Sequence, residues 1–237
     1  MCTVSFAPTA RGFRLAMNRD EKKIRIRGLA PSILRTRHRC AILPREPNGG
    51  TWIALNDAGI CLALVNWHAI ERAPRGKIAS RGLVIDALAT VATLGNAAER
   101  LKQLPLPQLR PFRLLVVVAR TRDLIEWRWD LRRLRRRKHA WQIGHWFSSG
   151  FDEAGAERER AEICAHAKSL NSPSGLRKLH RSHLPQRGPL SICMHRGDAA
   201  TVSYTEVAVS ARRVTMRYAD GPPCRHDSLL VTTLPRW

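Results

Sequence analysis

Met1-Cys2-Thr3-Val4-Ser5-Phe6 opens the chain, so a small residue follows the initiator methionine directly. An aminopeptidase is expected to remove Met1 before a small residue, which would make Cys2 the mature N-terminus. A thiol with a pKa of about 8.5 and an α-amine with a pKa of about 7.7–8.0 would then share one residue. A nucleophile and a candidate base would lie side by side. The alternative is that Cys2 is only a small apolar residue that opens an edge strand.

Three short boxes follow this start. Asn18-Arg19-Asp20-Glu21 lies where an apolar stretch meets a charged corner, and Gly49-Gly50-Thr51-Trp52 comes after a gap. Asn56-Asp57-Ala58-Gly59 then forms a turn before an apolar segment that ends in Asn66. Together with the Met-Cys-Thr start, these boxes resemble the NRDE family, which includes the transport and Golgi organisation proteins. That family is similar to the wider N-terminal-nucleophile (Ntn) hydrolases, such as penicillin and bile-salt acylases.

The resemblance is dense over residues 1–68 and looser over Ser191–Arg196 and Ala200–Ser203. It implies an α+β fold, a four-layer αββα sandwich of two antiparallel sheets flanked by helices. The residue pattern leads to the same packing, because strands, helices and strands follow one another along the chain. The pattern predicts strands over residues 3–7, 14–18, 52–56, 60–66, 112–119, 124–130, 141–147, 189–195, 201–209 and 213–218. It predicts helices over residues 80–94, 154–170 and 176–183.

Length and composition indicate one domain over residues 1–237, because 237 residues that are 44% hydrophobic can bury a full core. No apolar run reaches the eighteen or so residues of a membrane span, and the start lacks a basic region followed by an apolar one. We therefore expect a cytoplasmic protein. The six cysteines show no C-x-x-C spacing, which argues against a zinc ribbon and against a disulfide framework.

The charge is strongly positive, with 41 Lys and Arg against 19 Asp and Glu, a net charge of +22. Such a balance raises nucleic acid or an acidic surface as a partner. The densest group, here called the basic cluster, follows a predicted strand and is expected in a hairpin loop or at a strand end. It consists of Arg132, Arg133, Arg135, Arg136, Arg137 and Lys138. The alternative is a solvated loop, since arginine is spread along the whole chain and no nucleic-acid motif accompanies it.

Three further residues are catalytic candidates beside Cys2. Asp20 falls at a predicted strand end, where a carboxylate could orient an N-terminal amine, although a solvated turn acid is the alternative. Asn66 ends an apolar strand and is suited to donate to an oxyanion, unless it only begins a turn. The resemblance implies an arginine near the thiol on a closing strand, which points to Arg196, where a guanidinium would favour the thiolate.

Asn18, Arg19 and Ser149 are expected to line the same pocket. Relatives often have an asparagine as a second oxyanion donor where this chain has Ser149. Acylases also commonly place arginine three residues before the aspartate, where Met17 stands here, while Arg19 directly precedes Asp20. These departures put efficient amidase activity in doubt more than they do the fold.

Two histidine-containing pairs have spacing that a metal could use, namely His180 with His183 and Cys164 with His166. Neither pair has a third convergent ligand in the sequence, so we expect these histidines to lie on the surface and not to bind a metal. We predict no metal site and no cofactor.

The sequence thus predicts an enzyme in which Cys2 attacks the carbonyl of a non-peptide amide or related acyl substrate and forms a thioester. A second hypothesis is a non-catalytic binding or trafficking protein that handles lipid or haem, as the resemblance allows. A third is a basic protein that binds nucleic acid without sequence preference.

Overall fold

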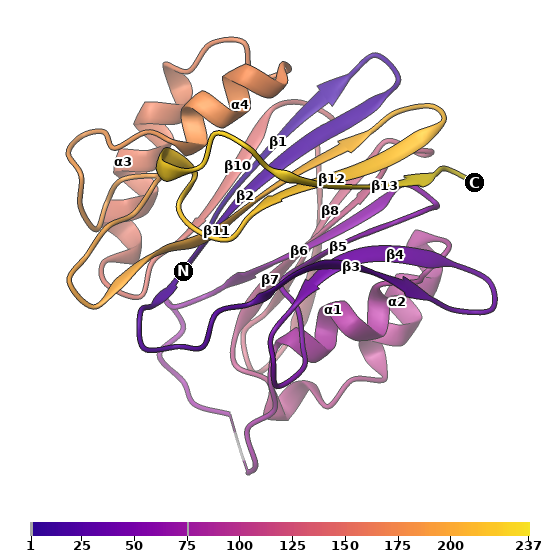
Figure 1. The fold of residues 1–237 in the computed structure, drawn as a ribbon. Helices are drawn as coiled ribbons and strands as arrows, with labels where there is room; N and C mark the ends of the chain where they lie inside the picture. Colours follow the sequence, from indigo (N-terminus) through magenta and orange to yellow (C-terminus); the bar gives the residue numbers. More distant parts are fainter. Residues whose placement is uncertain (1, 75) are drawn as a thin grey trace.

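The computed structural model describes residues 2–74 and 76–237, and in them the strands form two antiparallel sheets that stack face to face (Figure 1). Sheet A has the strand order β10-β1-β2-β11-β12-β13, and sheet B has the order β3-β4-β5-β6-β7-β8-β9. The strands of sheet A are β1 (Cys2–Thr9), β2 (Gly12–Lys22), β10 (Gly144–Ser148), β11 (Ala199–Val209), β12 (Arg213–Ala219) and β13 (Leu230–Pro235). Those of sheet B are β3 (Leu29–Arg35), β4 (Cys40–Arg45), β5 (Ile53–Asn56), β6 (Ile60–Asn66), β7 (Phe112–Val118), β8 (Asp123–Trp129) and β9 (Leu134–His139).

A pair of helices covers the outer face of each sheet. Helices α1 (Gly82–Leu88) and α2 (Leu94–Lys102) pack on sheet B, whereas α3 (Glu153–Ala165) and α4 (Pro173–His180) pack on sheet A (Figure 1). Two short 3₁₀ turns, Leu106–Gln108 and η2 (Pro223–Arg225), complete the described elements. The layer order is therefore α, β, β, α, and the predicted sandwich is confirmed.

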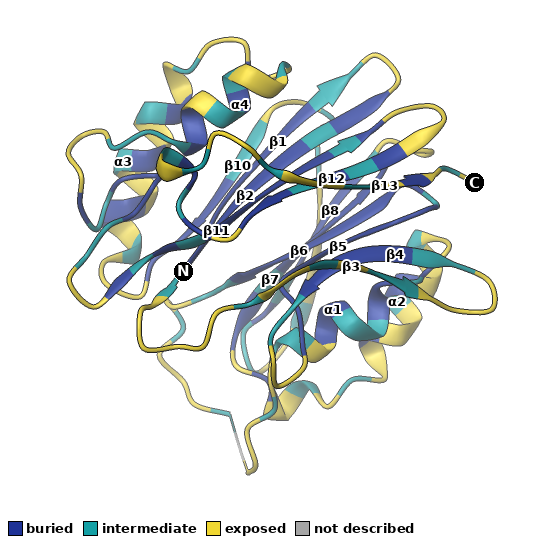
Figure 2. Ribbon diagram, viewed as in Figure 1, coloured by how far each residue is buried: buried dark blue, intermediate teal, exposed yellow. Residues whose placement is uncertain are grey.

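Three apolar clusters hold these layers together. The central one lies between the sheets and contains Cys2, Phe6, Phe13 and Met17. The other two lie under α1 and α2 and under α3 and α4. Figure 2 shows the result, with buried strands inside and exposed residues concentrated on loops and outer helix surfaces. Because Cys2 belongs to the central cluster, the start of the chain lies inside the sandwich.

The turn between β5 and β6 forms as its residues predict. Gly59 has φ of +75°, which favours glycine, and the Asn56 side chain accepts hydrogen bonds from the backbone N–H groups of Ala58 and Ile60 at 3.1 Å. This turn directs β6 back along β5, so that β6 ends at Asn66.

The single helix predicted over residues 80–94 is wrong, because the segment divides into α1 and the start of α2. The Asn56 amide donates to the carbonyls of Ala89 at 3.1 Å and Val91 at 2.8 Å. These hydrogen bonds replace the helical partners that the two carbonyls lack once α1 has ended. Thr93 then caps α2. The interruption depends on a residue more than thirty positions away, so local periodicity could not reveal it.

The strand predicted over residues 189–195 is also wrong, since this segment is an irregular connection. Its carbonyls are bound by side chains instead of a strand partner. Arg160 donates to the carbonyl of Leu190 at 3.2 Å, and Asn18 donates to that of Ile192 at 2.9 Å. The segment is therefore fixed to α3 and β2 without joining a sheet.

Arg132 and Arg133 of the basic cluster lie in the turn between β8 and β9, as expected, whereas the other four residues belong to a strand. Most of it forms β9, the edge strand of sheet B, which pairs only with β8 in the described residues. Its arginines and lysine are exposed, and Lys138 forms an ion pair with Asp123 at 2.9 Å. Charged side chains on an edge strand oppose pairing with another chain. Strands β3, β4 and β13 were likewise not predicted.

The helices of the described residues are all too short or too polar to cross a bilayer.

Candidate active site

A pocket of about 320 Å³ opens at the start of β1. Residues from both sheets and from the segment before α1 line it, and four of the predicted site residues are among them. The lining comprises Cys2, Arg19, Asp20, Glu21, Arg25, Glu46, Thr51, Trp52, Leu64, Asn66, Ile78, Ala79, Ser80, Arg81, Gly82 and Arg110. The fold thus brings Cys2, Asp20 and Asn66 to one cavity from three different strands.

Cys2 lies between two neighbouring strands, opposite Ser148 of β10 and Arg19 of β2. Its residue exposure is 6%, so the thiol meets the pocket from a mostly buried position. Burial raises the pKa of the Cys2 thiol and the charge of Asp20 adds to this shift, whereas the Arg19 guanidinium and a hydrogen bond from the Asp20 backbone oppose it. A nucleophile in this setting is a neutral thiol, which has to lose its proton to a base when it attacks.

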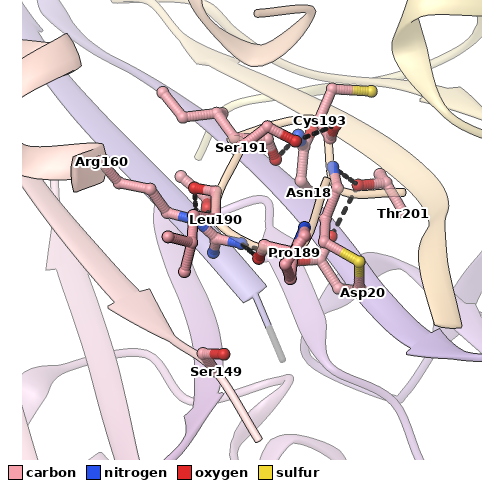
Figure 3. Close-up of polar contacts among 12 residues, drawn as sticks. Asn18, Asp20, Ser149, Arg160, Pro189, Leu190, Ser191, Cys193 and Thr201 are labelled. Atoms are coloured by element: carbon pink, nitrogen blue, oxygen red, sulfur yellow. Dashed lines mark hydrogen bonds and ion pairs between the residues drawn. The ribbon is translucent and has the colours of Figure 1, made fainter. Parts of the chain in front are cut away.

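Asp20 follows Arg19 on β2 and is held by two buried partners (Figure 3). Thr201 donates a hydrogen bond of 2.7 Å to Oδ1, and Arg160 Nη2 lies 3.6 Å from Oδ2. Burial raises the pKa of the Asp20 carboxyl, while the Arg160 guanidinium acts in the opposite direction. Arg160 also donates to Thr3 Oγ1 at 3.0 Å. It therefore links Asp20 to Thr3, the residue that follows Cys2.

A β-bulge places Thr201 against Asp20. Thr201 is paired with Asp20 and Ser203 with Arg19, so β11 uses one extra residue where β2 advances by one. Such a bulge turns a side chain away from the regular alternation and is common beside active sites. The bulge therefore allows the Thr201 hydroxyl to reach the carboxylate.

Arg19 forms one wall of the pocket in a fixed position. Its guanidinium donates to Glu46 Oε1 at 2.6 Å and lies 4.3 Å from the centre of the Trp52 ring. Asn66 is at the end of β6, where the strand leaves the sheet, and is only partly buried. It is the polar side chain that the end of β6 contributes to the lining.

The pocket also carries a surplus of positive charge. Glu21 and Glu46 pair with Arg19 and Arg25, as the ion pairs at 2.6 to 3.7 Å show. Two other lining arginines, Arg81 and Arg110, form no ion pair within the part of the chain that is described. Burial lowers the pKa of Arg81 to about 10, and the nearby charge of Arg110 adds to this effect.

Asn18 does not line this pocket, contrary to expectation, because its amide is used on the outer face of sheet A. It donates to the carbonyls of His180 and Ile192 at 2.9 Å and contacts the His180 ring at 3.1 Å. His180 is fully buried and also contacts Ser5 at 2.9 Å. The prediction of a surface histidine is therefore wrong for His180, which joins α4 to the sheet.

Arg196 and Ser149 also lie outside the lining. Arg196 pairs with Asp198 at 2.8 Å and lies 4.8 Å from the centre of the Phe151 ring. Ser149 Oγ accepts backbone hydrogen bonds from Phe151 and Asp152 at 3.2 and 3.3 Å, which stabilises the turn into α3. Figure 3 shows Ser149 apart from the group around Asp20. The buried cation beside Asp20 is Arg160, which sequence reasoning missed.

The two pairs considered as metal ligands do not form sites of their own. Cys164 is buried against sheet A while His166 is exposed, so the two side chains do not converge. His183 is separated from the buried His180, and it lies beside His195 instead, with 3.3 Å between their Nε2 atoms.

No family model matches the chain, and no curated protein matches it, so the NRDE resemblance gains no support from these comparisons. Solved structures do match. Penicillin V acylase from Agrobacterium tumefaciens has a TM-score of 0.56 at 11% identity, over 99% of this chain and 86% of that one. Two mutant forms of the conjugated bile acid hydrolase from Clostridium perfringens have a TM-score of 0.56 at 11% identity, over 98% of this chain and 92% of theirs. The chain therefore shares its overall fold with these two enzymes.

Proposed function

We propose that this protein is an N-terminal-cysteine amide hydrolase that acts on a non-peptide acyl amide. The observation that supports this most is the presence of Cys2, Asp20 and Asn66 in the lining of one pocket. The pocket occurs on the Ntn-hydrolase fold, at the start of the first strand. Removal of Met1 would free the Cys2 amine at that position.

In the proposed reaction, Cys2 Sγ attacks the substrate carbonyl carbon while the thiol proton moves to the free α-amine. The carbonyl oxygen becomes an oxyanion, which Asn66 stabilises by hydrogen bonding. The C–N bond then breaks, and the α-ammonium returns the proton to the departing amine. Water then attacks the thioester carbonyl and gives a proton to the α-amine. The C–S bond breaks, the acid leaves, and the α-ammonium returns the proton to the Cys2 thiolate.

Asp20 has the role of a positioning group for the α-amine in this mechanism. A carboxylate near the amine favours its protonated form after the thiol has transferred its proton. Thr201 fixes one carboxylate oxygen and Arg160 faces the other, so the carboxylate has little freedom to rotate. Arg160 replaces Arg196 as the arginine of the proposed site, acting on Asp20 instead of on the thiol.

The substrate class follows from the charge of the pocket. Arg81 and Arg110 face the cavity in addition to the balanced arginines, so a substrate that carries a carboxylate or sulfonate would neutralise them. We propose an N-acyl amide with such an anionic group. The basic cluster is not in the pocket lining and takes no part in this function.

Membership of the NRDE family and a cytoplasmic location complete the proposal. The family proposal rests on the N-terminal boxes of the chain.

A panel of N-acyl amides with and without an anionic group tests the function. The wild type should hydrolyse members of the anionic set, and Cys2→Ala should be inactive although folded. Mass spectrometry of the stopped reaction should find the acyl group on the Cys2 peptide. Cys40→Ala is the matched control, since Cys40 is a partly buried thiol outside the pocket. Equal turnover by wild type and Cys2→Ala would refute the proposal.

A further inference from the structure

Two cysteines and two histidines from three separate segments converge beside the irregular connection that precedes β11. His183 follows α4, Cys193 and His195 belong to the irregular connection before β11, and Cys224 is in η2. One ligand atom of each residue lies within 4.8 Å of the ligand atoms of all the others. None of these residues lines the Cys2 pocket.

The spacing of these atoms agrees with a tetrahedral metal centre. Zinc binds sulfur at about 2.3 Å and imidazole nitrogen at about 2.0–2.1 Å, which gives tetrahedral edges of about 3.3 Å for N···N and about 3.6 Å for N···S. The His183 and His195 Nε2 atoms are 3.3 Å apart. His195 Nε2 lies 3.6 Å from Cys193 Sγ and 3.5 Å from Cys224 Sγ.

We propose that His183, Cys193, His195 and Cys224 bind one Zn²⁺ ion as a structural site. The two thiols would each lose a proton and bind as thiolates, and the two imidazoles would bind through Nε2. All four tetrahedral positions are then filled by the protein, which is the arrangement of a structural zinc and not of a catalytic one. Two sulfur and two nitrogen ligands favour zinc over magnesium or calcium, which prefer oxygen.

The surrounding charge is compatible with this ion. Arg187 Nη2 lies 3.5 Å from His195 Nδ1, and Arg225 acts on the same ring. An isolated divalent cation would be repelled by these arginines, whereas two thiolates make the complete site neutral. Binding through Nε2 leaves a proton on Nδ1, so the long contact with Arg187 would open when zinc binds.

The ion would also stabilise the wall behind Asp20. Met194 lies between two of the ligands, and its backbone forms two hydrogen bonds of 2.9 Å with Thr201. Thr201 in turn binds Asp20. The connection before β11 has no strand partner over most of its length. A metal that joins it to the segment after α4 and to η2 would help to hold it in place, as a strand partner would.

A disulfide between Cys193 and Cys224 is the competing use of these thiols. It would account for two residues and leave the convergence of both imidazoles unexplained. A zinc site uses all four.

The experiment uses untagged full-length protein, purified with a reductant and without chelator, and measures zinc by mass spectrometry of the elements. We expect about one zinc per chain in the wild type and less than about a tenth of that in Cys224→Ser and His183→Asn. Cys40→Ser and His166→Asn, which lie outside the site, should retain the wild-type content. Chelator should lower the thermal midpoint of the wild type and leave that of Cys224→Ser unchanged.

A cobalt titration uses the wild type alone, so its result does not depend on whether the variants fold. Co²⁺ added to metal-free wild type should produce visible absorption typical of tetrahedral coordination, with thiolate charge-transfer bands, and Zn²⁺ should abolish it. Protein that takes up neither ion, or in which Cys193 and Cys224 form a disulfide under reducing conditions, would overturn the proposal. Neither readout depends on hydrolase activity, so this inference and the proposed function fail separately.

Discussion

The guanidinium of Arg160 lies 3.6 Å from the carboxylate of Asp20, and both side chains are completely buried. Each group compensates the charge of the other where both side chains are shielded from solvent. Removing one partner of such a pair leaves an uncompensated buried charge, which is costly. The pair therefore links the stability of the α3 layer to the proposed site.

Replacing Arg160 tests this link. Arg160→Met should lower the free energy of unfolding by about 3–5 kcal/mol, because Asp20 loses its buried counter-charge. Arg158→Met on the same helix is the control, since Arg158 is exposed and should change stability by less than about 0.5 kcal/mol. Urea denaturation measures both, and equal effects would show that the buried pair has no special role.

The protein should begin at Cys2 after expression, and iodoacetamide should label Cys2 while the fully buried Cys61 stays unlabelled. Cys2 lines the pocket, whereas burial strongly raises the pKa of Cys61. Intact-mass measurement and peptide mapping check both statements. Retention of Met1 in most molecules would contradict the proposed function, because the amine would then be acylated.

Removing the proposed oxyanion donor should slow the chemistry without altering the fold. Asn66→Ala should reduce kcat by about 10²–10³ on any amide that the wild type hydrolyses. Asn96→Ala, an exposed asparagine on α2, is the matched control and should keep wild-type kcat. A change in KM alone would assign Asn66 to substrate binding instead.

The unpaired arginines should determine the preference for anionic substrates. Arg81→Gln or Arg110→Gln should raise KM about tenfold for an anionic amide, the equivalent of one charge-assisted hydrogen bond, and leave a neutral analogue unchanged. Arg133→Gln in the basic cluster removes the same charge outside the lining and should have no effect. Loss of activity on both substrates to the same degree would argue against charge recognition.

Glu126 should make the fold sensitive to acid. Burial acts to raise its pKa, but Arg128, Arg113 and His139 outweigh burial and lower it to about 2. A pKa that is depressed in the folded state stabilises the protein above the unfolded pKa, near 4.3, and this stabilisation is lost as pH falls toward about 2. Glu126→Gln should therefore unfold more easily at pH 7 and show a weaker decline between pH 5 and 3.

Unfolding midpoints of the wild type and of Glu126→Gln, measured at several pH values, test the role of Glu126 in acid sensitivity. Asp198→Asn is a suitable control, because Asp198 forms an ion pair with Arg196 and the Asp198 side chain is 57% exposed. A wild type and a Glu126→Gln variant with parallel pH dependence would rule out the assigned role of Glu126.

Local pattern sufficed for much of the fold. Apolar runs predicted β6 and β7, and alternation of apolar and polar residues predicted β8. The Asn56 to Gly59 turn predicted how β5 and β6 are connected, because strand pattern and turn chemistry act over a few residues. The boxes near the start also predicted that Cys2, Asp20 and Asn66 belong together, and the structure places all three in one lining.

Other features depend on which distant segments meet, and only the tertiary structure decided them. Arg160 reads as an ordinary charged residue of a helix, yet it is buried because α3 packs over Thr3 and Asp20. The four proposed zinc ligands span forty-two positions without a recognisable spacing motif, and they converge because the connection before β11 folds back between α4 and η2. Periodicity records which face of an element is apolar, whereas the partner of a buried charge or thiol is set by long-range packing.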